Sequence, residues 1–458
     1  MRLSTATRER LAFALAGAAA LFYVERALAE FQDLGIGRQL EYDYLQFWRA
    51  ASDLAHGRDL YVAFLTNCPL NEWCRGGYIY PPLFAELFRP LLAFDPYAGA
   101  AIWLWVNHLM VVACMVVVYY GLRRWLTPTL AALLAAGWLA FLPLQASLYF
   151  MQVNVLLLLL LSLAAVAFVA DDRRPAAGAW LATAAMLRVT PILMVPTLLQ
   201  KGFRRRPLPV IALVITGGLL AIVSWLANPG TPRYFSVVLP RLGNGTAFYE
   251  NQSVPGLFLR IQDLVMHQRP QPFGLFPIAL MALVLGVTWR MSWAVTGPKG
   301  RAAVFAAFLA ATPVVSSITW QHHLVSEMLA IALLAPSMGV SRAGRGLIIA
   351  SYPFLWIDIH STIGIAGSLG LNSGILVGSQ VPLFLLFYGW NTVGMTLLWL
   401  GALAVLRTLR RELSAVNTEG SGQLRAGHRG RTRSAILDGA APPLSFGPGS
   451  HEGERMTL

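Results

Sequence analysis

Long apolar segments constrain this chain more than any other feature of its sequence. A helix needs about 20 mostly apolar residues to cross the hydrocarbon core of a bilayer. Only 12% of the residues are charged, against about 25% in soluble proteins. We therefore predict an all-α polytopic membrane protein, with about 10–12 transmembrane helices and short helices in its outer loops. The predicted spans cover residues 11–30, 99–121, 129–147, 153–170, 208–227, 273–289, 302–318, 322–340, 346–360 and 378–406, the last with a possible break at Gly389 and Asn391.

Basic residues orient these spans. Arginines and lysines cluster in short loops on one side, as cytoplasmic loops of membrane proteins do, so the net charge of +13 does not indicate nucleic-acid binding. Arg8 and Arg10 place the N-terminus in the cytoplasm, and the first span lacks a small-residue cleavage site, so we expect it to remain as a helix. The outer face then holds residues 31–98, 148–152, 228–272 and about 319–322, with a further turn around 358–377.

One apolar segment, residues 176–199, conflicts with a simple crossing because basic clusters flank both of its ends. A single crossing would place the second cluster, Lys201 to Arg206, outside. A re-entrant hairpin of two half-helices, broken near Arg188 to Pro191, keeps both clusters inside. Since proline disfavours helical geometry in the residue before it, we favour the hairpin or a strongly broken helix.

The remaining segments set the domain limits. Residues 1–411 are predicted to form one transmembrane domain whose large outer loops are about 31–98 and 228–272. Residues 412–458 are rich in Gly, Ser and Arg and predict a disordered cytoplasmic tail. Cys114 lies in an apolar span and is interpreted as packing, whereas Cys68 and Cys74 share one polar loop and could form a disulfide if that loop is extracytoplasmic.

Polar residues gather on the predicted outer face. Each group also has a structural interpretation: Asp43 as a helix cap in an aromatic belt, the carboxamides as a helix cap, Asn251 to Ser253 as a glycosylation sequon, the histidines as packing residues. Arg188 is different, since a mid-membrane arginine costs about 2.5–3.5 kcal/mol and is a functional candidate by default. The outer groups are Asp43 with Tyr42, Tyr44, Phe47 and Trp48; Tyr80; Gln152 and Asn154; Asn251, Ser253 and Arg260; and Trp320, His322 and His323.

In this order the residues resemble glycosyltransferase family 87, within the GT-C superfamily of membrane glycosyltransferases that use polyprenyl-phosphate sugars. The resemblance runs from about residue 31 to 325. The chain departs from the family pattern at the Cys68–Cys74 insertion, in the C-terminal tail, and at Arg188, where a lysine is more usual. The matching motifs are Asp43, Phe47-Trp48, Ala50-Ala51, Leu54, Gly57 and Tyr61; Tyr80-Pro81-Pro82; Gln152 and Asn154; Arg188 and Pro191; Asn251 to Ser253; and Ser317, Trp320, His322 and His323.

The resemblance implies a GT-C-type bundle and an inverting transfer of a hexose, by default mannose, from a polyprenyl monophosphate. The acceptor would be a glycolipid or cell-envelope glycan at the extracytoplasmic face of a bacterial inner membrane. Asp43 would be the general base, and no metal or other cofactor would be required. The donor phosphate and sugar would contact His322, His323, Arg260, Arg188, Gln152, Asn154 and Asn251, and the acceptor or aromatic wall would comprise Tyr44, Trp48, Tyr80 and Trp320.

Two other functions fit a polytopic membrane protein. A secondary transporter or lipid flippase would need ionisable residues in several spans, and the spans here are nearly free of them apart from Arg188 and Glu327. It would also favour internal pseudo-symmetry, which the sequence lacks. A structural or assembly subunit would not need polar groups that converge on one face.

Overall fold

The computed structural model describes residues 4–35, 42–66, 77–170, 174–200, 207–228, 230–262, 274–371 and 380–434. Within these ranges the chain is helical and contains no β-strand, which confirms the predicted all-α class. The chain divides into two compact units, Met1–Arg410 and Arg411–Leu458, a division one residue from the predicted domain limit. The disorder of the tail stays a prediction, since the last helix, α21, is described as far as Ser434.

The helices of the first unit agree closely with the apolar segments. Four described helices are each long and apolar enough to cross a membrane, and six spans result if each of two bent pairs counts as one. The four are α1 (Thr5–Gly35), α5 (Pro96–Leu122, continued by η2, Arg123–Trp125), α11 (Leu208–Ala227) and the part Trp390–Ser414 of α21 (Trp390–Ser434), which begins in this unit. The bent pairs are α6 (Pro128–Leu139) with α7 (Leu142–Tyr149), and α18 (Arg342–Trp356) with α19 (Ile359–Ser368).

Shorter helices complete the bundle. α16 is buried along most of its length, so it lies at the centre of the core. α20 ends at Tyr388 and α21 begins at Trp390, which confirms the predicted break at Gly389. The shorter helices are α8 (Asn154–Ala170), α9 (Pro175–Leu187), α15 (Phe276–Ser292), α16 (Gly297–Val315), α17 (Val325–Leu334), η8 (Ala335–Ser337) and α20 (Val381–Tyr388).

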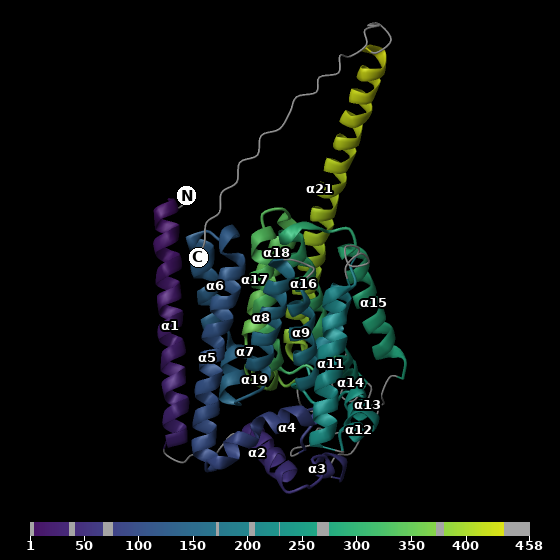
Figure 1. Cartoon of the computed structure of the whole chain (residues 1–458). Helices are drawn as coiled ribbons and strands as arrows, with labels where there is room; N and C mark the ends of the chain where they lie inside the picture. The colour runs from purple at the N-terminus through teal and green to yellow at the C-terminus, as the bar shows by residue number, and fades with distance from the viewer. Residues whose placement is uncertain are drawn as a thin grey trace, which may run out of the picture. The chain divides into compact units, whose positions relative to one another are not determined.

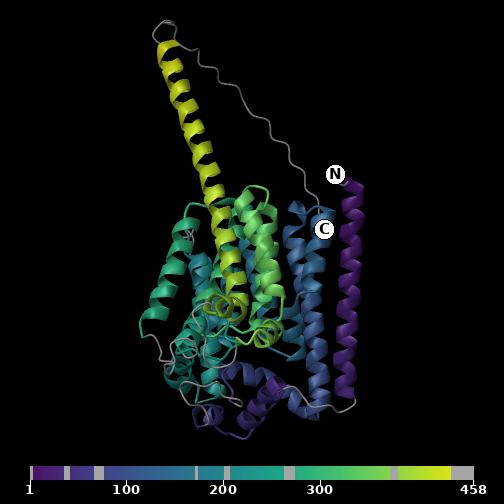
Figure 2. The ribbon, with the colours of Figure 1, turned by 180° about the vertical axis from the view of Figure 1, so that it is seen from behind.

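Short helices cover one end of the first unit, the end away from the start of α1 (Figures 1 and 2). They come from the two large predicted outer loops and pack through aromatic side chains, with Phe47 at the centre of a cluster that includes Tyr80, Phe84 and Phe88. These helices are α2 (Tyr42–Ala55), α3 (Val62–Thr66), α4 (Pro82–Phe88), η1 (Arg89–Ala93), α12 (Thr231–Arg233), η5 (Tyr234–Val238), α13 (Leu239–Gly243) and α14 (Val254–Arg260).

The segment after α8 enters the bundle and turns back. α9 and α11 run in the same direction, because Gly178 lies against Pro209 near their starts, and Ala182, further along α9, lies against Gly217, further along α11. The chain must therefore return between them, and it does so through η3 (Thr190–Met194) and α10 (Val195–Leu198). The parallel packing supports the hairpin over a single crossing.

Contacts at the end of the hairpin agree with this path. Gln200 donates from Nε2 to Ser292 Oγ over 2.8 Å, at the end of α15. Nearby in the chain, Arg301 at the start of α16 donates from Nη2 to the carbonyl of Val169 over 2.7 Å, at the end of α8. The segment therefore finishes at the end of the bundle from which α9 starts.

A Gly178→Ala substitution is expected to loosen the contact between α9 and α11. A Cβ at this position would lie 1.7 Å from the carbonyl oxygen of Pro209, and overpacking of this kind costs about 1–3 kcal/mol. Thermal unfolding in detergent should show a lower Tm. Gly218→Ala on α11 is the matched control, because a Cβ there meets no atom within 4 Å. Equal Tm values for the two variants would contradict this close contact between α9 and α11.

Candidate functional site

The carboxylate of Asp43 lies in the first turn of α2 and is held by a residue from another part of the chain. Gln152 donates from Nε2 to Asp43 Oδ2 over 2.5 Å. The other end of the same carboxamide accepts from the hydroxyl of Tyr80, at 3.0 Å from Oε1. Three residues that the sequence predicted at the site, separated by as many as 109 positions, therefore form one chain of hydrogen bonds.

A second hydrogen-bonded group forms around Arg188. The helix α9 ends at Leu187, and Arg188 adopts an extended conformation with φ −154° and ψ 128°. Its Nη1 donates to Asn154 Oδ1 over 2.5 Å, and its Nη2 lies 2.7 Å from Nε2 and 2.9 Å from Nδ1 of His323. The break in the hairpin thus presents the guanidinium to side chains from α8 and from the segment before α17.

The charge of Arg188 has no acidic partner in the part of the chain that the structure describes, where the ion pairs involve other cations. Nδ2 of Asn154 is buried beside it and also has no hydrogen-bond partner among the described residues. Arg188 is half-buried, and taking a cation partly out of water without a counter-ion is costly. Together, a guanidinium and a vacant amide donor are suited to binding an anion.

The two adjacent histidines both lie in η7 (Gln321–Leu324) and take different positions. The ring of His323 stacks on Trp320 with an interplanar angle of 4°, and its Nδ1 accepts from the backbone N–H of Trp320 over 3.0 Å. The ring of His322 is nearly perpendicular to it, at 83°, and packs on Phe150.

Two cavities meet at Arg188. The first, of about 60 Å³, is mainly apolar and extends among α8, η3 and α16, where Leu157, Leu161 and Leu309 line it. The second, of about 100 Å³, has an aromatic wall of Tyr80, Tyr234 and Trp320. The side chains that line both cavities are Arg188, Thr190, Ser316, Ile318 and His323.

The short segment from Met151 to Asn154 joins the two groups. Gln152 holds Asp43 and Asn154 holds Arg188, although only one residue separates them in the chain. Met151 has a positive φ of 50°, an uncommon conformation for a residue other than glycine. It closes the end of α7 in a Schellman arrangement, with Met151 N–H donating to Leu148 and Gln152 N–H to Ser147.

Asn251 and Arg260 do not line either cavity. Asn251 is fully buried, donates to the carbonyls of Thr246 and Ser317, and accepts from the N–H of Thr319. Arg260 is also buried and donates to the carbonyls of Phe248, Asn251 and Tyr388. The structure thus gives both residues backbone partners, and it does not bring them to Arg188 as the sequence prediction of a donor site expected.

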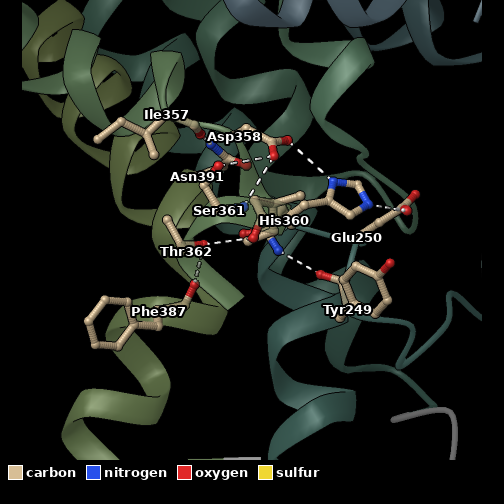
Figure 3. A network of polar contacts seen from close by, with 11 residues as sticks. Tyr249, Glu250, Ile357, Asp358, His360, Ser361, Thr362, Phe387 and Asn391 are labelled. Atoms are coloured by element: carbon tan, nitrogen blue, oxygen red, sulfur yellow. Dashed lines mark hydrogen bonds and ion pairs between the residues drawn. The ribbon is translucent and has the colours of Figure 1, made fainter. Parts of the chain in front are cut away.

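A further polar network supports the same loop (Figure 3). His360 of α19 lies between two carboxylates, with Nε2 3.2 Å from Glu250 and Nδ1 3.3 Å from Asp358. Glu250 precedes Asn251, whose side chain holds the backbone of Ser317 and Thr319. The network therefore braces the loop that positions one wall of the second cavity.

The other residues that the sequence singled out lie away from the two cavities or outside the described residues. Tyr44 is buried against Phe88, and neither Tyr44 nor Trp48 lines either of the two cavities at Arg188. Cys68 and Cys74 lie outside the described residues, so their pairing stays a prediction. Cys114 is buried and unpaired.

Sequence reasoning missed Tyr234 and Thr190. Tyr234 begins η5, is 2% exposed and faces the second cavity. No motif marks it, because only the folding of the second large loop brings it beside Tyr80. Thr190 lies two residues after Arg188 and lines both cavities. The predicted break at Pro191 was the sequence signal that could have identified it as a site residue.

An Arg260→Leu substitution is expected to destabilise the fold while leaving donor binding intact. Three backbone carbonyls would lose a charged donor, and buried groups left without partners cost about 1–3 kcal/mol each. Thermal unfolding in detergent should show a lower Tm, whereas KM for the sugar donor should stay unchanged in the folded fraction. A raised KM at unchanged Tm would instead support Arg260 as a phosphate ligand.

The part of the chain that the structure describes has no group of three or more His, Cys, Asp and Glu side chains that could hold a metal ion. Nitrogen-bearing groups dominate the site, through Arg188, Asn154 and His323. Such groups suit an anion better than a divalent cation. The transfer without metal or cofactor stays a prediction.

No curated protein matches the chain. The solved structure of ArnT from Cupriavidus metallidurans bound to undecaprenyl phosphate is 15% identical, with a TM-score of 0.42, and the alignment covers 88% of this chain and 80% of that one. The structure of the same protein in the apo state gives 15% identity and a TM-score of 0.38, covering 86% and 78%. The model of glycosyltransferase family 87 matches residues 78–317, more than half of the sequence, and the chain therefore belongs to this family.

Proposed function

We propose that this membrane glycosyltransferase transfers a hexose, by the family default mannose, from a polyprenyl-monophosphate donor. The acceptor is a glycolipid or cell-envelope glycan, and the transfer takes place at the extracytoplasmic face of a bacterial inner membrane. Asp43 is the general base, and Arg188 with Asn154 and His323 binds the donor phosphate.

The observation that carries the proposal is the position of Arg188. Its guanidinium lies where an apolar cavity and an aromatic-walled cavity meet. A lipid-linked sugar has the same order of parts: an apolar chain, a phosphate and a sugar. The side chains at the two cavities follow this order, with apolar residues on one side of Arg188 and aromatic rings on the other.

The residues support a single displacement at the anomeric carbon. Asp43 accepts the proton of the acceptor hydroxyl as the oxygen forms its bond to that carbon, and the bond to the phosphate oxygen breaks. The lipid phosphate leaves with the bonding electrons, and Arg188 stabilises the charge that it gains. One carboxylate suffices, whereas glycosidases generally need a pair. One displacement inverts the anomeric configuration.

Turnover of a defined donor tests the proposal. Purified protein in nanodiscs is incubated with polyprenyl-phosphate mannose and a glycolipid acceptor, and the product is analysed for its anomeric configuration. We expect a mannosylated lipid with inverted configuration and release of polyprenyl phosphate. Parallel reactions with polyprenyl-phosphate glucose, galactose and arabinose identify the sugar. Failure to bind or turn over any of these donors would contradict the function.

A further inference from the structure

We propose that Gln152, oriented by Tyr80, is a positioning residue for Asp43 and does not bind the donor sugar. The inference rests on the proposed role of Asp43 as general base. It assigns Gln152 differently from the sequence prediction, which placed this residue among the ligands of the donor.

Both ends of the Gln152 carboxamide are already used within the protein. The side chain is buried, with 1% of the residue exposed. Its Oε1 accepts from Tyr80 at 3.0 Å, and its Nε2 donates to Asp43 at 2.5 Å. Neither Gln152 nor Asp43 lines the two cavities at Arg188, and Tyr80, which lines the second, connects both residues to it. A buried amide with partners at both ends is a poor candidate for a sugar ligand.

Tyr80 determines which end of the amide meets the carboxylate. A phenol has one hydrogen to donate, and burial raises the pKa of Tyr80, so the hydroxyl keeps this hydrogen at physiological pH. The amide oxygen accepts it, and the NH₂ group must then face Asp43. Without the tyrosine hydroxyl, the carboxamide could rotate and present its oxygen to the carboxylate.

Hydrogen bonds of the backbone fix the position from which the Gln152 side chain extends. Its N–H donates to Ser147 over 2.8 Å, and the indole N–H of Trp103 donates to the carbonyl of Met151 over 2.8 Å. Met151 holds a left-handed conformation that is strained for a residue other than glycine and persists only where the surroundings enforce it. Asp43 belongs to a separate outer helix, so Gln152 ties the carboxylate to the rigid junction of α7 and α8.

This tie has two consequences for catalysis. A base must be held close to its productive position, since a misplacement of about 1 Å can cost 10²-fold in rate. A hydrogen-bond donor also favours the ionised form of a carboxylate. Loss of Gln152 should therefore lower kcat and move the acid limb of the pH–rate profile to higher pH.

The test measures sugar transfer across pH for two variants. Gln152→Ala is expected to lower kcat about 10- to 100-fold, to keep KM for the donor within about twofold, and to raise the midpoint of the acid limb by about one pH unit. Tyr80→Phe should also lower kcat and raise the midpoint of the acid limb, each by a smaller amount. Gln152→Glu keeps the packing and places a second carboxylate beside Asp43, so it should raise the midpoint further even where the alanine variant folds poorly.

Matched controls use the same residue types elsewhere. Gln200→Ala removes a buried carboxamide bonded to Ser292, and Tyr78→Phe removes a buried hydroxyl bonded to the carbonyl of Pro81. Both should keep the wild-type kcat and acid limb. A raised KM with an unchanged acid limb in Gln152→Ala would overturn the inference and restore Gln152 as a sugar ligand. An active Asp43→Asn enzyme would instead overturn the proposed base, so the two failures are distinguishable.

Discussion

An Asp43→Asn enzyme is expected to bind its donor normally and to lose sugar transfer by roughly 10²- to 10⁴-fold, the usual contribution of a positioned general base. The substitution keeps the shape of the side chain, and the new Oδ1 can still accept from Nε2 of Gln152, so the geometry of the outer helices should persist. A carboxamide, however, does not accept the proton of the acceptor hydroxyl. Single-turnover transfer and equilibrium donor binding, measured on the same preparation, separate the two effects.

The same helix offers a control for this substitution. Asp53 lies near the end of α2 and pairs with Arg58 at 2.7 Å on the protein surface. Asp53→Asn removes a carboxylate from the same element, and a surface pair contributes only about 0–1 kcal/mol. We expect wild-type transfer from this variant. Transfer at the wild-type rate by Asp43→Asn would exclude Asp43 as the base.

The fold was largely predictable because the bilayer limits it. The lengths and order of the apolar segments located the spans, and the break at Gly389 was visible as a glycine in a segment too long for one helix. The hairpin at Arg188 followed from the charge on its flanks. The direction of α9 relative to α11 needed the structure, because the sequence alone also allowed a single crossing.

The site was only partly predictable because motif order identifies residues without their partners. Asp43, Gln152, Tyr80, Arg188, Asn154 and His323 were all named from the sequence, and the structure joins them in two groups. The sequence could not separate residues that face the cavities from those that hold the loops. Arg260 shows the difference, since its charge suggested a phosphate ligand, whereas its contacts are backbone carbonyls made available by the folding of the second loop.

The second large effect is expected at Arg188. Arg188→Gln should weaken binding of polyprenyl phosphate by roughly 10²- to 10³-fold, since loss of one partner in a buried, hydrogen-bonded charge pair costs about 2–5 kcal/mol. Arg188→Lys should retain part of the affinity, because it keeps the charge but not the planar fork. Arg301→Gln is the control, as that guanidinium caps the carbonyls of Val169 and Ala170 at the end of α8.

Stability provides a second measurement that distinguishes a binding role from a structural one. Because Arg188 forms no ion pair with a carboxylate of the described chain, its partial burial costs free energy without ligand. Arg188→Gln should therefore keep or raise the Tm of the ligand-free protein. The stabilisation that polyprenyl phosphate gives to the wild type should disappear, because a ligand stabilises only the state that binds it. A lower ligand-free Tm with undiminished stabilisation by polyprenyl phosphate would show that Arg188 supports the fold and that another cation binds the phosphate.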